Sequence, residues 1–300
     1  MDEQIEGMIF DIQRYALHDG AGLRTDVFFK GCPLRCAWCA NPESQAIQPE
    51  FALSAQQCMA CDQFPEICPV KWQQDRDQLR TQEKERDYAR RVALCPTEAI
   101  HQFGERWTAG AVMQEVLRDR VFYGDGGGVT LTGGDPTMQP EFAEAILRLT
   151  KAAGISTAIE TCGHAAWSVW ERLLPHLDQI LFDVKHLDSA VHRQFTGIGN
   201  ELILSNLRQL IARHAPVTMR VPLIPGFNTS TESLRAIAAF AREANFERLD
   251  LLPYHTYGKS KYAALNRAYP WDDTPRLTPS EIDAISMRLA SYGLTVNIGG

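Results

Sequence analysis

Three cysteines stand close together near the N-terminus, at Cys32, Cys36 and Cys39, with the spacing C-x3-C-x2-C. Three thiolates on one short loop can bind three irons of a cubic [4Fe–4S] cluster, which leaves the fourth iron without a cysteine. An open coordination position distinguishes catalytic metal sites from closed structural ones. The alternative is a zinc loop, but zinc sites favour C-x2-C pairs and four protein ligands. The spacing therefore predicts an iron–sulfur cluster whose open iron could be chelated by an amine and a carboxylate.

A second group of cysteines follows at Cys58, Cys61, Cys68 and Cys95, and the last of these opens the phrase Cys-Pro-Thr-Glu-Ala-Ile. This phrase resembles the end of a bacterial ferredoxin motif, and four thiolates are sufficient for one closed [4Fe–4S] cluster. A structural zinc with four cysteines is the alternative, because the spacing between Cys61 and Cys68 is irregular for a ferredoxin. The eighth cysteine, Cys162, has no partner left in this count, and we interpret it as a small buried hydrophobic residue.

Much of the chain alternates short β-rich runs with amphipathic helical patterns, and these elements must position the cysteines. The predicted strands are Val27–Phe29, Gly128–Leu131, Thr157–Glu160, Ile180–Val184, Thr218–Leu223 and Leu249–Leu252. The predicted helices are Pro140–Ala153, Trp167–Leu174, Leu202–Ala212, Thr231–Ala244 and Pro279–Tyr292, and a last run, Thr295–Ile298, follows them. Six strands, most of them followed by a helix, predict an α/β fold with a parallel sheet and right-handed crossovers. Two more repeats would be needed to close an eight-stranded barrel, so we expect an open, partial barrel.

Residues 48–104 interrupt this alternation, because they contain the second cysteine group and a highly polar run from Gln73 to Arg91. Such a run is typical of a solvated helix or a mobile connection. We therefore predict a barrel built from residues 1–47 and 105–300, with a small iron–sulfur insertion at residues 48–104.

Candidate ligand-binding residues follow the predicted strands, and in parallel α/β folds ligands bind at the carboxyl ends of strands. Gly134 belongs to a glycine pair that would allow a ligand to approach the backbone closely. Asp183 and Lys185 lie on one face of a strand end, because side chains alternate along a strand. Arg220 could bind a carboxylate through two parallel hydrogen bonds, and His255 lies just after the carboxyl end of the sixth predicted strand. Taken alone, each residue could instead have a purely structural role, in a tight turn, in an ion pair or as a hydrogen-bonded polar side chain.

Composition excludes several classes of protein. The 300 residues carry a formal net charge of −7, which argues against binding of nucleic acid through phosphate neutralisation. No apolar run approaches the roughly 18–20 residues of a membrane span. The acidic, polar segment Met1–Gly7 is no secretory signal, so a cytoplasmic location is expected.

Several phrases in the expected order resemble one family. The pattern C-x3-C-x-aromatic-C, with Trp38 at the aromatic position, is similar to the motif of radical S-adenosylmethionine (SAM) enzymes. The phrase DGAGLRT at residues 19–25 resembles the DGPGIRT signature of glycyl-radical-enzyme activating enzymes, as do NPE at 41–43 and LLPYH at 251–255. Two residues depart from the family pattern: Ala21 stands where proline is usual, and Asp135 stands where glutamate is usual.

The resemblance implies a fold, cofactors and site residues. The fold would be the partial (β/α)6 TIM-like barrel of radical SAM enzymes with a ferredoxin-like iron–sulfur insertion. Cys32, Cys36 and Cys39 would hold the catalytic [4Fe–4S] cluster, and a monovalent cation would lie near Glu160. The residues implied to bind SAM are Trp38, Cys39, Ala40, Gly134, Asp183, Val184, Lys185, Arg220 and His255.

The resemblance also implies an activity. The reduced cluster would cleave SAM to a 5′-deoxyadenosyl radical, and the radical would take a Cα hydrogen from one glycine of a partner glycyl radical enzyme. Flavodoxin or ferredoxin would supply the electron, and oxygen would destroy the open cluster. Two alternatives stay open from the residues: a radical SAM enzyme that acts on a small molecule, and a non-catalytic iron–sulfur electron carrier.

Overall fold

The computed structural model of the chain describes residues 2–59, 92, 95–272 and 274–299. Its main feature is a nine-stranded sheet with the order β11-β10-β9-β8-β7-β6-β2-β1-β5. Its strands are β1 (Glu6–Ala16), β2 (Arg24–Phe29), β5 (Glu105–Thr108), β6 (Gly128–Gly133), β7 (Ser156–Thr161), β8 (Gln179–Asp183), β9 (Val217–Leu223), β10 (Arg248–Pro253) and β11 (Thr295–Ile298). From β2 to β11 every neighbouring pair is parallel, whereas β1 pairs antiparallel with both β2 and β5. The predicted α/β fold with an open parallel sheet is therefore confirmed.

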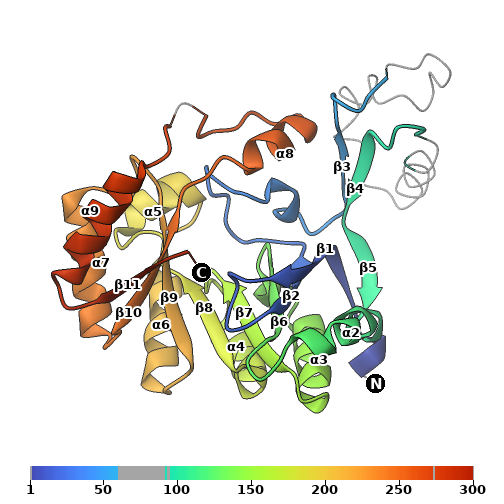
Figure 1. Cartoon of the computed structure of the whole chain (residues 1–300), viewed down its shortest axis with the longest axis horizontal. Helices are drawn as coiled ribbons and strands as arrows, with labels where there is room; N and C mark the ends of the chain where they lie inside the picture. Colours follow the sequence, from blue (N-terminus) through green and yellow to red (C-terminus); the bar gives the residue numbers. More distant parts are fainter. Residues whose placement is uncertain (1, 60–91, 93–94, 273, 300) are drawn as a thin grey trace.

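The described helices lie between or beside the strands in sequence; most of them cover the outer face of the curved sheet, whereas α8 lies apart from that face, at the top of the view in Figure 1. They are α2 (Ala109–Arg118), α3 (Pro140–Ala152), α4 (Trp167–Leu173), α5 (Ser189–Thr196), α6 (Glu201–Ala212), α7 (Thr231–Glu243), α8 (Gly258–Ala264) and α9 (Pro279–Ala290). Short 3₁₀ turns are η1 (Asp2–Gln4), η2 (Pro42–Ser44), η5 (Arg120–Phe122), η6 (Pro136–Met138) and η7 (Leu174–His176). Local signals set several boundaries: Thr278 and Glu281 form a capping box that starts α9, and Gly197 ends α5 in the left-handed region at φ 89°.

Side chains alternate along the strands, so one face of the sheet packs in an apolar core under the helices and the concave face carries polar side chains. Val129 and Leu131 of β6 and Phe182 of β8 are fully buried in the core against the outer helices. The residues between them in sequence, such as Thr130 and Thr132, turn to the concave face of the sheet. This concave face therefore carries hydroxyl, carboxyl and guanidinium groups, and it forms the walls and floor of the site described below.

The described ends of the predicted insertion form a separate two-stranded sheet. In it, β3 (Glu50–Leu53) pairs antiparallel with β4 (Ile100–Phe103), and the pair projects from the barrel (Figure 1). Cys61, Cys68 and the polar run Gln73–Arg91 lie outside the described residues. In the part of the chain that the structure describes, no helix is long and apolar enough to cross a membrane.

Candidate active site

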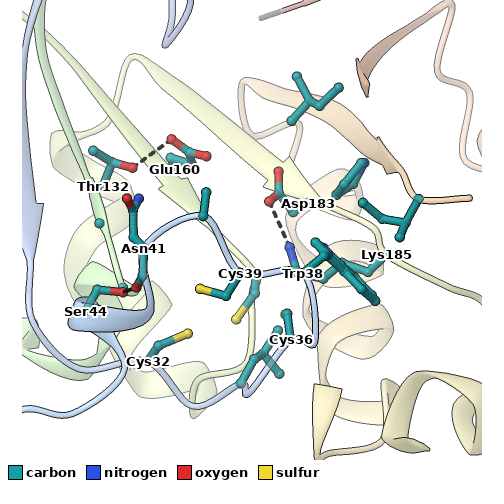
Figure 2. A pocket seen from close by; sticks show the side chains of 18 of the residues that line it. Cys32, Cys36, Trp38, Cys39, Asn41, Ser44, Thr132, Glu160, Asp183 and Lys185 are labelled. Atoms are coloured by element: carbon teal, nitrogen blue, oxygen red, sulfur yellow. Dashed lines mark hydrogen bonds and ion pairs between the residues drawn. The ribbon is translucent and has the colours of Figure 1, made fainter. Parts of the chain in front are cut away.

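The loop that carries the first three cysteines leaves the carboxyl end of β2. Backbone hydrogen bonds anchor it on both sides: the N–H of Gly31 donates to the carbonyl of Ser44 (2.7 Å), and that of Arg35 donates to the carbonyl of Thr196 (2.7 Å). Figure 2 shows the sulfur atoms of Cys32, Cys36 and Cys39 turned toward a common space. The short spacing of the motif and these anchors together bring the three thiols to one side of the loop.

A cavity of about 220 Å³ opens beside these thiols. Among its lining residues are eleven that the sequence singles out: Cys32, Cys36, Trp38, Cys39, Ala40, Gly134, Glu160, Cys162, Asp183, Lys185 and His255. Two predicted SAM-binding residues do not line it. The side chain of Val184 is buried in the apolar core, and its backbone N–H donates to the carbonyl of Arg220 (2.9 Å). The guanidinium of Arg220 lies behind the cavity wall, where it is paired with carboxylates.

The donor set fits an iron–sulfur cluster. Burial raises the pKa of the Cys36 thiol to about 12 and also raises the pKa values of Cys32 and Cys39, so iron must displace protons when it binds. Among the residues that the structure describes, no group of three His, Cys, Asp or Glu side chains could hold a single metal ion. A cubic cluster does not need such convergence, because each thiolate binds a different iron.

Asp183 and Lys185 form an ion pair at the end of β8, as the alternation of side chains predicts. The Nζ of Lys185 donates to Oδ2 of Asp183 at 3.0 Å, and both side chains line the cavity (Figure 2). Although burial opposes ionisation, Lys185 and Arg220 hold the pKa of Asp183 below its ordinary value. The cavity therefore presents an ammonium and a carboxylate side by side, a pair suited to a zwitterionic ligand.

Arg220 is the centre of a buried ion cluster that the sequence analysis did not predict. Its side chain is 1% exposed, and it donates to Glu160 and, at 3.0 Å, to Asp183, while Asp19 lies 3.8 Å away. The other oxygen of Glu160 accepts the hydroxyl of Thr132 at 2.7 Å (Figure 2). The predicted contact of Arg220 with a ligand carboxylate would therefore require one of these ion pairs to be exchanged.

The buried carboxyl of Asp26 is a second feature of the barrel interior that the sequence analysis did not predict. Its carboxyl is fully buried on the concave face of β2, and no donor among the described residues bonds either of its oxygens. Burial, followed by the neighbouring Asp19 carboxyl, raises the pKa of Asp26 to about 9, so this carboxyl is protonated at neutral pH. A protonated Asp26 can donate a hydrogen bond to Asp19 and hold the DGAGLRT loop against the barrel floor.

This protonation predicts a pH-dependent effect of Asp26→Asn. Folding takes up a proton at Asp26 at pH values between the ordinary 3.8 and about 9, so its contribution to stability falls as pH rises through that window. Asparagine is neutral at every pH and can donate to Asp19. When the pH is raised from 5 to 8, the free energy of unfolding should therefore fall less in Asp26→Asn than in the unsubstituted protein. The difference should be up to about 1.4 kcal/mol per pH unit. Parallel curves of unfolding free energy against pH, measured with urea, would contradict the assignment.

The backbone itself requires glycine at both positions of the pair Gly133–Gly134. A Cβ on Gly134 would lie 2.2 Å from the carbonyl oxygen of Gly31, at the start of the cysteine loop, and Gly133 has φ 103°. Next to the pair, Asp135 does not line the cavity but is fully buried beneath it. Cys162 is buried and is bonded to no other cysteine, as the sequence predicts, and its thiol also donates a hydrogen bond to Asp135 at 2.9 Å.

Aromatic side chains and helix α8 cover the cysteine loop from outside. Trp38 is 8% exposed and packs on Phe227, with ring centroids 4.4 Å apart, and on Trp271 at 5.7 Å. A Cβ on Gly258, at the start of α8, would lie 2.4 Å from the carbonyl oxygen of Cys39. Lys261 of α8 pairs with the buried Glu43 of the NPE phrase, so the phrase attaches this helix to the cysteine loop.

Cys58 and Cys95 are the two described members of the second cysteine group, and both lie near one end of the β3–β4 pair. Beyond the last pair of the register, Leu53 with Ile100, the N–H of Ser54 donates to the carbonyl of Ala99 (2.8 Å). Cys58 lies four residues after Ser54, and Cys95 lies four residues before Ala99. Although burial opposes it, hydrogen bonds from Thr97 and the following backbone hold the pKa of Cys95 below its ordinary value. Cys58 and Cys95 thus leave the same end of the sheet.

Comparison with known proteins identifies the family. Residues 27–238 match the model of the radical SAM superfamily. The choline trimethylamine-lyase activating enzyme of Oleidesulfovibrio alaskensis is 40% identical over 308 aligned positions, which cover 98% of each chain. The isethionate sulfite-lyase activating enzyme of the same organism is 41% identical, over 90% of each chain.

A solved structure of Streptococcus suis SuiB bound to its precursor peptide SuiA has a similar fold. Its TM-score is 0.50 at 14% identity, and the match covers 90% of this chain and 46% of that one. The family match and the cysteine loop imply a [4Fe–4S] cluster and SAM as cofactors. With an open parallel sheet, the three-cysteine loop and relatives of about 40% identity over nearly the whole length, the chain belongs to the radical SAM superfamily and, within it, to the glycyl-radical-enzyme activating enzymes.

Proposed function

We propose that this chain activates one particular glycyl radical enzyme, with the cluster held by Cys32, Cys36 and Cys39 and with SAM bound in the adjoining cavity. The observation that carries the proposal is the shared cavity: three thiols lie on one wall, and Gly134, Asp183, Lys185 and His255 lie around the rest. The chemistry that the cofactors supply when bound is reductive cleavage of SAM to methionine and a 5′-deoxyadenosyl radical, which removes a Cα hydrogen atom from a glycine of the partner.

The chain's own residues position and shield this chemistry. Asp183 and Lys185 can pair with the ammonium and carboxylate of the methionyl end, and the glycine pair lets that end approach the backbone. His255 stacks on Tyr257 with ring centroids 4.3 Å apart, and burial lowers its pKa, so it meets the adenosyl part as a neutral ring. Trp38 and its aromatic neighbours exclude water from the outer side of the cysteine loop.

The open sheet favours a protein substrate. Strands β11 and β5 are its two edges, so no strand pairing closes the barrel within the described residues. A loop of another protein can therefore reach the concave face. The two relatives of nearly equal identity activate different enzymes, a choline lyase and an isethionate lyase, so overall identity does not select the partner. The DGAGLRT and LLPYH phrases support a protein substrate over a small molecule.

We also propose that the insertion holds a second [4Fe–4S] cluster, which relays electrons from flavodoxin or ferredoxin. The proposal is supported by the positions of Cys58 and Cys95, which both lie a few residues beyond the same end of β3–β4. Cys61 and Cys68 would complete the ligand set. A structural zinc is the alternative. A monovalent cation near Glu160 stays a prediction, because it would have to share that carboxylate with Thr132 and Arg220.

An anaerobic assay tests the main proposal. The protein is reconstituted with iron and sulfide, dithionite and SAM are added, and 5′-deoxyadenosine is quantified by mass spectrometry. We expect product that depends on the reductant. A glycyl radical signal in electron paramagnetic resonance, after addition of a candidate partner, would then identify the partner. Protein that has its full iron content, binds SAM and yet forms neither product nor radical with any candidate would reject the proposal.

Replacement of Cys95 tests the second cluster. Cys95→Ala should remove roughly half of the bound iron if each cysteine group holds one four-iron cluster, and it should leave some SAM cleavage with dithionite. The measurements are iron per protein and 5′-deoxyadenosine formed. Unchanged iron content would refute a cluster at this group, and zinc detected in the purified protein would support the alternative.

A further inference from the structure

The fully buried carboxylate of Asp135 accepts hydrogen bonds from three residues. Its Oδ1 accepts the backbone N–H (3.0 Å) and the hydroxyl (2.7 Å) of Thr137. Its Oδ2 accepts the hydroxyl of Thr161 (2.9 Å), and also the backbone N–H (3.0 Å) and the thiol (2.9 Å) of Cys162. Each oxygen of Asp135 therefore has at least two donors, and these hydrogen bonds fix the carboxylate in place.

These hydrogen bonds join the ends of two strands where the pairing between them stops. The last paired residues of β6 and β7 are Leu131 and Ile159. Thr137 belongs to η6, which follows β6, whereas Thr161 ends β7 and Cys162 comes next. Beyond the last pair, the Asp135 carboxylate therefore takes over the connection between the two strand ends.

The backbone of the same residue holds the start of the cysteine loop. The N–H of Asp135 donates to the carbonyl of Gly31 at 2.8 Å, and the N–H of Gly134 donates to the carbonyl of Phe29 at 2.8 Å. Asp135 thus links three segments: the end of β2 with Cys32 next to it, the glycine pair, and the end of β7. Gly134, Thr161 and Cys162 all line the cavity, whereas Asp135 does not.

The Cys162 thiol is a fixed donor in this arrangement. Burial, together with the Asp135 carboxylate, raises the pKa of Cys162 well above its ordinary value, so the thiol keeps its proton. Serine has a donor at the same position and alanine has none. The pair Cys162→Ser and Cys162→Ala therefore separates the hydrogen bond from the volume of the side chain.

We propose that Asp135 is a positioning residue, which acts with the Thr161 hydroxyl and the Cys162 thiol to set the distance between Gly134 and the end of β7. That distance is the width of the cavity where the methionyl end of SAM binds, so the inference rests on the proposed function. Asp135 does not contact the ligand itself. It fixes the backbone that does.

The test combines SAM binding with a readout that needs no SAM. Asp135→Asn keeps the size but puts an amide N–H₂ where an acceptor is needed. We expect its Kd for SAM, measured anaerobically on the cluster-loaded protein, to rise roughly tenfold, the loss typical of one hydrogen bond to a charged group. Iron content and kcat for 5′-deoxyadenosine at saturating SAM should stay unchanged. In the SAM-free protein, amide hydrogen exchange of Gly134 and Cys162 should become faster.

Matched variants make the outcome decisive. Cys162→Ala should shift Kd and exchange in the same direction by a smaller factor, Cys162→Ser should restore both, and the exposed Asp125→Asn should change neither. Faster exchange with unchanged Kd would show a purely structural link and overturn the positioning role, as would unchanged values of both in Asp135→Asn. Failure of the unsubstituted, iron-replete protein to bind SAM would reject the proposed site itself, a result distinct from either of these.

Discussion

Cys36→Ala is expected to reduce 5′-deoxyadenosine formation to the level measured without enzyme. Cys36 lines the cavity and stands between Cys32 and Cys39 along the loop, and a cubic cluster with one open iron needs all three thiols. The fourth cysteine of the cavity, Cys162, cannot replace it without giving up its hydrogen bond to Asp135. The measurements are anaerobic SAM cleavage with dithionite, the iron content per protein and the electron paramagnetic resonance signal of the reduced cluster.

Cys95→Ala is the matched control, because it removes a thiol from the other cysteine group. It should retain dithionite-dependent cleavage, since that reductant can reach the first cluster directly. Loss of cleavage in Cys36→Ala together with its retention in Cys95→Ala would assign the catalytic cluster to the first group. Any turnover kept by Cys36→Ala would reject that assignment.

Strands buried in the parallel sheet could be predicted from the sequence, because their apolar residues recur in short, dense runs. The run Ile180–Val184 lies within one residue of β8 at each end, and the last run, Thr295–Ile298, coincides with β11. Strand β1 (Glu6–Ala16) was missed. It pairs antiparallel, and its middle is largely exposed, so polar residues such as Asp11 and Arg14 interrupt the pattern. Helix α8 was missed as well, because it is short and its packing against Cys39 depends on tertiary contact.

Residues of the site could be predicted by type and spacing, but their partners could not. The C-x3-C-x2-C spacing and the Asp183–Lys185 pair are local features, and the structure places them together around one cavity. The contact between Asp183 and Arg220 is set by the register of β8 against β9, where the two residues are direct partners. The thiol of Cys162 donates to Asp135 where the ends of β6 and β7 come together in the folded chain. No local pattern encodes such pairs.

Arg220→Met is expected to lower the free energy of unfolding strongly. It replaces a buried guanidinium by an apolar side chain of similar length and leaves Glu160, Asp183 and Asp19 without their shared cation. Removal of one partner from a buried ion cluster typically costs about 3–5 kcal/mol, because uncompensated charge remains in a medium of low dielectric constant. Arg220→Lys keeps the charge but cannot span the carboxylates as a planar fork, so we expect an intermediate loss.

The pH dependence of this loss identifies its cause. Arg220 and Lys185 hold the pKa of Asp183 below its ordinary value, and Arg220 opposes the rise that burial imposes on the pKa of Glu160. Without Arg220 both pKa values rise, so the folded variant takes up protons that the unfolded chain releases, and its stability falls as pH increases above the ordinary carboxyl range. The difference in unfolding free energy between Arg220→Met and the unsubstituted protein should therefore grow from pH 5 to pH 8. A difference that stays constant over this range would show that lost packing, and not stranded carboxylates, accounts for the destabilisation.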